Sequence, residues 1–237
     1  MQACFCRTDT DVVDRVPLKE VITIARKHID VAGLQSYRRP THPDPERRGT
    51  LFQLLAQIII SQRATLDNEI RAAESLFKEY PHPADIRTAS VENIAEKIRP
   101  AGLQRSKAMS PRAVTEAWGE APDDVESVVT IMDDVRAREY LMQLPRVGKK
   151  TADCMLELGL GRTVLPIETN IRQLADVLGY RHTRLNDTEL QIFLQSQLEQ
   201  TNEACAEAHA LLLGLGQRLC GSRNACEECP LCIERYI

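Results

Sequence analysis

Residues that could do chemistry lie close together in the stretch LPRVGKKTADCMLELGLGRTVLPIETN, residues 144–170. A turn carrying Lys149 and Lys150 opens a predicted helix, and Glu168 follows in an otherwise uncharged run. A partly neutral lysine amine is a nucleophile, and burial beside other cations lowers the pKa of such a lysine. A carboxylate can stabilise positive charge that develops on a reacting carbon. Either the two groups act on one reacting atom, or these are ordinary charges on surface loops.

The turn LPRVGKK has the layout of a helix–hairpin–helix motif. Pro145 is expected to end the first helix, and Gly148 to supply backbone freedom. The N–H groups at the start of the second helix are unpaired and attract a phosphate, and Lys149 adds positive charge nearby. The alternative is a plain tight turn between two core helices.

Four of the eight cysteines fall within the last eighteen residues, with x5, x2 and x2 spacings: Cys220, Cys226, Cys229 and Cys232. Four thiolates suit a 4Fe–4S cluster or a structural zinc ion. Zinc sites of this type usually have two CxxC pairs separated by a longer loop, so three cysteines at x2 intervals favour the iron–sulfur cluster. Unligated thiols are the remaining alternative. The other four cysteines are scattered and are expected to be small buried or surface residues.

Composition indicates a folded protein with an aliphatic core. The 237 residues are 43% apolar and 27% charged, and only 4% are aromatic. No apolar run approaches the roughly 20 residues of a membrane helix, and no secretory signal is visible at the N-terminus. We therefore expect an intracellular protein that is not secreted.

The net charge of −4 argues mildly against nonspecific binding to nucleic acid. Basic residues nevertheless cluster in two places. Residues 97–112 hold five Lys and Arg residues and no acid, and Arg146, Lys149 and Lys150 form the second cluster. Each cluster is either a phosphate-binding surface or a solvated face.

The chain reads as all-α. Residues 17–33 have helical periodicity, residues 38–49 form a proline-rich linker, and no segment alternates with the period of a strand. Further helices are predicted over 51–61, 65–80, 91–98, 105–118, 122–129, 134–144, 149–158, 169–179, 186–199 and 202–218. So many helices favour two lobes with a cleft between them. We assign one lobe to residues 50–162, and the other to 1–49 plus 163–237 with the cysteines.

The segment LPRVGKKTAD…LPIETNIRQLADVLG resembles the core of the helix–hairpin–helix DNA glycosylases, in particular their endonuclease III branch. The pattern there is approximately LPGVGRKTA followed by VDTHVxRVxxRLG. LLAQIIISQRATLDN, AGLQRSKA and the cysteine tail resemble that branch's LLxxxLSxQtTDxx, IGLYxxKA and iron–sulfur segments. The resemblance runs in order from about Thr50 to Cys232.

The resemblance implies catalytic roles for two residues. Lys150 matches the lysine that attacks C1′ of the damaged nucleotide's sugar, and Glu168 stands at the aspartate that assists it. Glutamate is one methylene longer, and we expect the pocket to have adjusted around it. Asn170 replaces a common histidine, and Arg146 replaces the hairpin's first glycine.

The resemblance also implies DNA contacts and a cofactor. Gln62 and Leu103 match wedge residues that occupy the gap left by an extruded nucleotide. The remaining implied DNA contacts lie in the hairpin: Arg146, Val147, Gly148, Lys149 and Thr151. The four clustered cysteines would hold a 4Fe–4S cluster, although the family spacings are about x6, x2 and x5, so the last interval here is short.

These features predict a base-excision repair glycosylase with abasic-site lyase activity, acting through a lysine Schiff base on double-stranded DNA with a damaged base, commonly a pyrimidine, or an abasic site. One alternative is a glycosylase in which Glu168 activates water. The other is a lesion-binding protein that does not cleave. The sequence does not name the base. A monomer is the default expectation, located in the cytoplasm with the nucleoid or in the nucleus.

Overall fold

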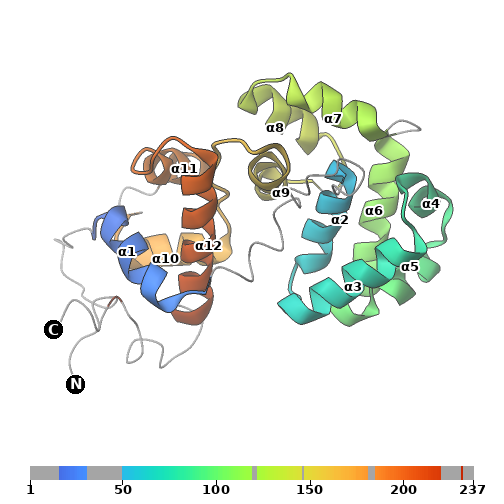
Figure 1. The fold of residues 1–237 in the computed structure, drawn as a ribbon, viewed down its shortest axis with the longest axis horizontal. Coiled ribbons are helices and arrows are strands. Elements are labelled where there is room, and N and C mark those ends of the chain that lie inside the picture. The colour runs from blue at the N-terminus through green and yellow to red at the C-terminus, as the bar shows by residue number, and fades with distance from the viewer. Residues whose placement is uncertain are drawn as a thin grey trace. The chain divides into compact units, whose positions relative to one another are not determined.

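The protein is helical throughout the part of the chain that the structure describes. The computed structural model describes residues 16–30, 50–118, 122–145, 147–180, 185–219 and 231. Within these ranges there are helices and connecting turns but no strand (Figure 1). The predicted all-α class is confirmed. None of the helices in these ranges combines the length and apolar character needed to cross a bilayer.

The chain divides into two compact units. Unit 1 comprises Met1–Leu34 with Thr163–Ile237, and unit 2 comprises Gln35–Arg162. The assignment of functional lobes made from the sequence stays a prediction. The proline-rich stretch 38–49 lies outside the described residues.

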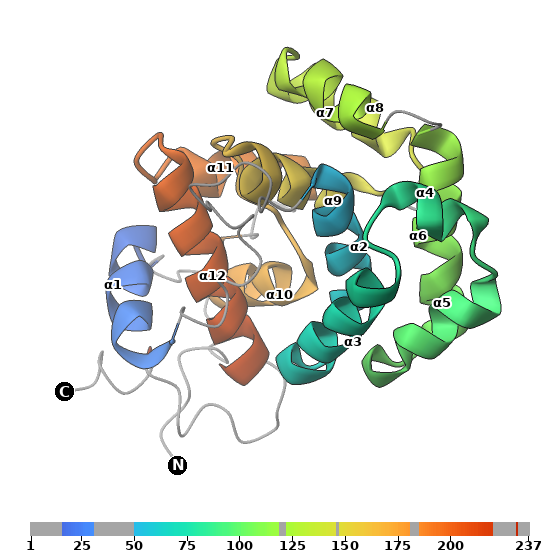
Figure 2. The ribbon, with the colours of Figure 1, turned by 45° about the vertical axis from the view of Figure 1, so that its right-hand side comes forward.

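Unit 2 is organised around one buried helix. Its helices are α2 (Leu51–Ser61), α3 (Leu66–Glu79), α4 (Pro83–Thr88), α5 (Val91–Lys97), the 3-10 helix η4 (Arg99–Ala101), α6 (Gln104–Trp118), α7 (Pro122–Thr130), α8 (Asp134–Met142), α9 (Lys149–Cys154) and the π-helix η5 (Met155–Gly159). Most side chains of α2 are buried, and α3, α6, α9 and η5 pack against it (Figure 2). Its N-terminus is fixed by a capping box between Thr50 and Gln53.

Two local predictions for unit 2 were incomplete. Helix α4 was missed, because its six residues are too few to show a periodic pattern. The helix predicted over 149–158 is α-helical only to Cys154 and continues as the π-helix. In the π-helix the bare backbone of Gly159 approaches Leu51 and Leu54, where a Cβ would lie 2.7 and 2.8 Å from their side chains.

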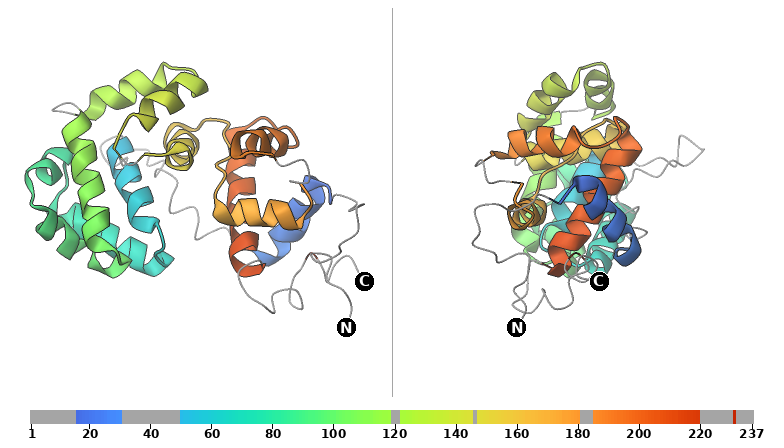
Figure 3. Two further views of the ribbon diagram at one scale, coloured as in Figure 1. Left: turned by 180° about the vertical axis from the view of Figure 1, so that it is seen from behind. Right: turned by 90° about the vertical axis from the view of Figure 1, so that its left-hand side faces the viewer.

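The described part of unit 1 combines one early helix with three later ones. These are α1 (Leu18–His28), α10 (Thr169–Val177), α11 (Asp187–Gln195) and α12 (Asn202–Leu219). The long helix α12 packs against both α1 and α10, as the two views of Figure 3 show. One apolar cluster joins all four helices, and the hydroxyl of Tyr180 donates a hydrogen bond to the carbonyl of Val16. Leu231, in the cysteine tail, belongs to the same cluster and is buried.

Two glycines of α12 permit close packing in unit 1. A Cβ on Gly216 would lie 2.5 Å from the backbone carbonyl oxygen of Asn170 in α10. A Cβ on Gly214 would lie 2.5 Å from Cγ2 of Ile29, which is a side-chain atom. Backbone cannot move out of the way as easily as a side chain, so Gly216 is the stricter requirement.

We predict that Gly216→Ala lowers the free energy of unfolding by up to about 2 kcal/mol. Overpacking costs about 1–3 kcal/mol, and the better helix propensity of alanine offsets about 1 kcal/mol of that loss. Gly214→Ala is the matched control, because it has the same propensity gain in the same helix but meets a side chain. Denaturant unfolding of both variants tests this, and equal losses would contradict it.

Candidate active site

The predicted hairpin is a tight turn between α8 and α9. The N–H of Val147 donates to the carbonyl of Leu144 (3.1 Å), and the N–H of Ala152 donates to that of Gly148 (3.0 Å). Val147 and Thr151 are each only 5% exposed. Their side chains therefore support the turn, and a ligand outside it could reach only their backbone. Arg146 lies outside the described residues.

Gly148 is the N-cap of α9 and has ordinary extended backbone, with φ −93° and ψ 177°. Our expectation that it supplies special backbone freedom is therefore wrong. A Cβ at this position would meet no described atom within 4 Å. Internal packing thus does not require the glycine. Glycine adds no side chain at the N-cap of α9.

A buried carboxylate ties the two helices of the hairpin together. Asp153 has a side chain that is 1% exposed; its Oδ1 accepts from Arg138 Nε at 2.5 Å, and its Oδ2 accepts from Lys149 Nζ at 2.7 Å. A buried charge is stable only when it is paired, so the two cations hold the carboxylate and the carboxylate holds them. We did not single out Asp153 from the sequence, although its i, i+4 spacing from Lys149 is a recognisable signal.

This pairing separates the two adjacent lysines. The ammonium of Lys149 is directed to Asp153, so much of the charge that we expected it to offer a phosphate is already compensated. Lys150 follows one residue later in the first turn of α9, and it is half-buried. Successive helical residues leave the axis about 100° apart, so Lys150 leaves α9 in a different direction from Lys149.

Glu168 lies at the start of a helix in unit 1. It is the N-cap of α10, with extended backbone, and its side chain does not cap the helix. The carboxylate is 18% exposed, and its Oε1 lies 3.6 Å from Nε2 of His209 in α12. That distance suits an ion pair with a protonated imidazole but is too long for a hydrogen bond. His209 was missed because nothing in the helical run AEAHALLLG marks it.

Glu168 and Lys150 belong to different units. Their expected arrangement across a cleft therefore stays a prediction. The two wedge residues, by contrast, both lie in unit 2. Gln62 is the exposed C-cap of α2, and Leu103, two residues after the end of η4, is 58% exposed.

The predicted cluster ligands Cys220, Cys226, Cys229 and Cys232 lie outside the described residues. In the described ranges, no group of three or more His, Cys, Asp or Glu side chains could hold a metal ion. Leu231 stands between two of these cysteines and packs into the core of unit 1.

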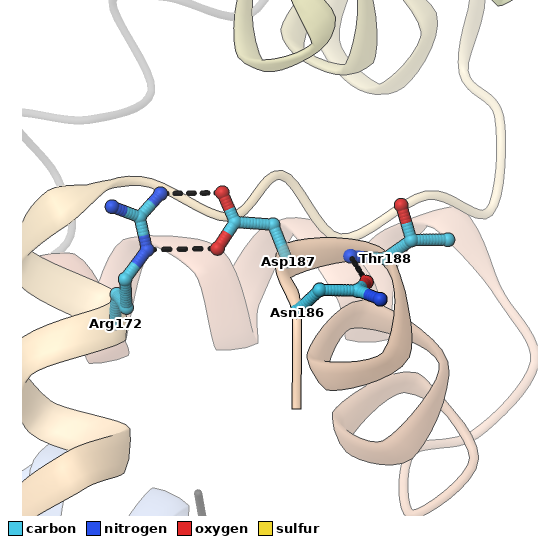
Figure 4. Close-up of a pocket in the computed structure, with 4 residues that line it drawn as sticks. All are labelled: Arg172, Asn186, Asp187 and Thr188. Carbon is cyan, nitrogen blue, oxygen red and sulfur yellow. Dashed lines mark hydrogen bonds and ion pairs between the residues drawn. The ribbon is translucent and has the colours of Figure 1, made fainter. Parts of the chain in front are cut away.

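A separate hollow in unit 1 contains none of the predicted site residues. It is lined by Arg172, Asn186, Asp187 and Thr188 (Figure 4). Arg172 donates from Nε to Oδ1 of Asp187 at 2.8 Å and from a second nitrogen to Oδ2, and Asn186 caps α11. These polar groups satisfy one another, so the hollow is explained as a helix-capping structure.

Comparisons with known proteins agree with this fold. No protein-family model matches the chain. Endonuclease III of Thermotoga maritima is 28% identical over 186 residues, which cover 76% of this chain and 80% of that protein. Endonuclease III of Bacillus subtilis is 26% identical over 186 residues, covering 76% and 78%. A solved structure of a trapped endonuclease III–DNA covalent intermediate superimposes with a TM-score of 0.63 at 20% identity, covering 88% of this chain and 90% of that one.

The chain is thus similar to endonuclease III in sequence and in fold. The relatives match it over about three-quarters of its length, and the solved structure shares its fold over 88% of the chain. Helices α8 and α9, with the turn between them, lie where the sequence predicts the helix–hairpin–helix motif. The resemblance noted from the sequence motifs is confirmed.

We predict that Asp153→Asn destabilises the protein by about 2–4 kcal/mol, because the substitution leaves Arg138 and Lys149 without their shared charge. Asp67→Asn is the control, since Asp67 is 80% exposed and its Arg71 partner is 3.7 Å away. Such a surface pair contributes little to stability, so no measurable change is expected there. Thermal and denaturant unfolding provide the measurement. Equal stabilities of the two variants would show that the buried triad does not hold the hairpin.

Proposed function

We propose that this protein is a DNA base-excision repair glycosylase with abasic-site lyase activity, acting on damaged pyrimidines. The observation that carries the proposal is the start of α9. A bare glycine N-cap and a half-buried lysine in the first turn occur together there, in an endonuclease III-like chain. The enzyme class is supported by relatives named endonuclease III and by the shared fold.

Lys150 would act as the nucleophile. Its Nζ lone pair forms a bond to C1′ while the bond from C1′ to the base breaks, and the base leaves with the electron pair and takes up a proton. Opening of the sugar ring then gives a Schiff base between Nζ and C1′. Loss of a proton from C2′ expels the 3′ phosphate by β-elimination, and water finally releases the lysine.

Glu168 would assist by stabilising positive charge on the sugar. The carboxylate is mostly withdrawn from solvent, and such a group interacts more strongly with a developing charge than it would in water. Its position at the N-cap of α10 places it at the helix end that carries partial positive charge. His209 is close enough to influence where the longer glutamate side chain lies.

Double-stranded DNA containing a damaged base or an abasic site is the proposed partner, bound by a monomer. The open backbone at Gly148 would face a phosphate directly. Because Lys149 is paired with Asp153, the N–H groups of the helix would provide more of this contact than the lysine charge does.

The proposed cofactor is a 4Fe–4S cluster held by Cys220, Cys226, Cys229 and Cys232. Four thiolates are the donor set that such a cluster requires. Its role would be to hold the C-terminal segment in place, since Leu231 beside the last cysteine is already anchored in the core of unit 1.

We predict that the purified protein contains about four iron and four sulfide per chain, and that Cys226→Ser lowers both. Cys205→Ser is the control, because Cys205 is fully buried in α12 and precedes the first of the four clustered cysteines by fifteen residues in the sequence. Metal and sulfide analysis is the measurement. One zinc per chain without sulfide would replace the cluster by a structural zinc site.

We predict that borohydride traps the wild type covalently on duplex DNA containing an abasic site and that Lys150→Ala abolishes the adduct. Glu168→Gln should form it about 10²–10³-fold more slowly, because it removes charge stabilisation without removing the nucleophile. Lys78→Ala, on an exposed position of α3, is the control and should match the wild type. Base release without any adduct would instead support a glycosylase that activates water. DNA binding without either reaction would support a lesion-binding protein.

A further inference from the structure

A buried lysine links two separate segments of unit 2. Lys107, in the first turn of α6, is 4% exposed. Its Nζ donates to the carbonyl of Ile60 at 2.8 Å and to the carbonyl of Ala101 at 2.7 Å. Ile60 is near the end of α2, and Ala101 ends η4. One ammonium therefore links these two helix ends by hydrogen bonds to both.

The same two segments present the wedge residues. Gln62 follows Ile60 by two residues, and Leu103 follows Ala101 by two residues. The backbone N–H of Lys107 also donates to the carbonyl of Leu103 at 3.0 Å. Lys107 thus contacts the backbone two residues before Gln62. It also contacts the backbone two residues before Leu103 and the backbone of Leu103 itself.

Both turns have unusual backbone. Arg63, after Gln62, has φ 56°, and Leu103 itself has φ 48°. Non-glycine residues are rare in the left-handed region, because the conformation is strained, and they persist there only where the surroundings determine them. Leu103 is also a largely exposed apolar side chain, so burial does not explain its conformation. The two carbonyl contacts of Lys107 are a physical reason why these turns keep their shape.

Stability alone does not explain a charged group at this position. Burial lowers the pKa of Lys107, and the nearby carboxylate of Glu69 raises it in part. Glu69 is 1% exposed and accepts a hydrogen bond from Gln57 Nε2 at 3.2 Å. An apolar side chain of similar volume often serves a core as well or better. It could not, however, join two carbonyls from separate segments.

We propose that Lys107 is a positioning residue that fixes the spacing between Gln62 and Leu103 for nucleotide extrusion. The inference rests on the proposed function, in which these two side chains occupy the gap left by an extruded nucleotide. Inserting a wedge offsets the cost of unstacking only if both side chains meet the duplex together. Lys107 touches neither the sugar nor the base and acts through the two turns.

Loss of the two carbonyl contacts of Lys107 should therefore slow the reaction most on substrates from which the nucleotide is costly to extrude. A displacement of about 1 Å can cost on the order of a hundredfold in rate. We expect Lys107→Met to lower the single-turnover rate about a hundredfold on a damaged base paired in a duplex. The same lesion in a single strand needs no extrusion, and its rate should change by no more than about threefold.

The experiment compares Lys107→Met with Lys78→Met, which makes the same substitution at an exposed position of α3. Single-turnover rates are measured on the two substrates. A duplex with a tetrahydrofuran abasic analogue and 2-aminopurine opposite it reports insertion of the wedge by fluorescence, without any reaction. We expect Lys107→Met to lose most of the fluorescence change, and Lys78→Met to keep it.

A double-mutant cycle with Leu103→Ala tests whether Lys107 acts through the wedge. If it does, the double variant is no slower on the duplex than the slower single variant, because the effects are not additive. Additive losses, equal losses on both substrates, or an unchanged fluorescence response would overturn the inference. If Lys107→Met does not fold, Lys107→Arg carries the test. It keeps the charge but cannot place one nitrogen between both carbonyls, so the duplex-specific loss is expected again.

The two proposals fail in different ways. If the wild type neither releases a base nor forms an adduct on either substrate, the proposed function is wrong, and the fluorescence response still decides whether Lys107 positions the wedge. If the wild type reacts and Lys107→Met reacts at the same rate on the duplex, only the positioning role is wrong.

Discussion

The hairpin depends on the carboxylate of Asp153, which is buried between two cations. Arg138 reaches it from α8, and Lys149 reaches it from the first turn of α9. If either cation turned to solvent, the buried carboxylate would lose one of its two charged partners, which is unfavourable. The turn that exposes Gly148 and places Lys150 is therefore held by an ion pair on its inner side.

A second buried charge in unit 2 has a comparable place: the ammonium of Lys107 joins the ends of α2 and η4. In both places a charged side chain inside the protein fixes loop backbone that is exposed outside it. An aliphatic core alone specifies loop positions poorly, because dispersion forces have no direction, whereas hydrogen bonds and ion pairs do. A core with few aromatic residues makes such directional contacts more important.

Helix positions could be predicted from the sequence because their apolar periodicity and caps are local signals. The helix over Leu51–Ser61 has the predicted bounds, whereas α4 was too short to show a period. The resemblance motifs pointed to Lys150 and Glu168, but no local pattern could show that Asp153 is buried or that His209 approaches Glu168. Those contacts join residues from different helices. The role expected of Gly148 was wrong because the presence of a glycine in the sequence does not reveal its φ angle.

The discontinuous composition of unit 1 has a consequence for biosynthesis. Helix α1 leaves the ribosome early, yet the helices that cover its apolar face, α10 and α12, are made only after all of unit 2. Unit 2 can therefore complete its core while α1 still lacks its partners. During that interval Val21, Ile22 and Ala25 would offer an uncovered surface to chaperones. The order of synthesis thus makes unit 1 the later and more vulnerable folding event.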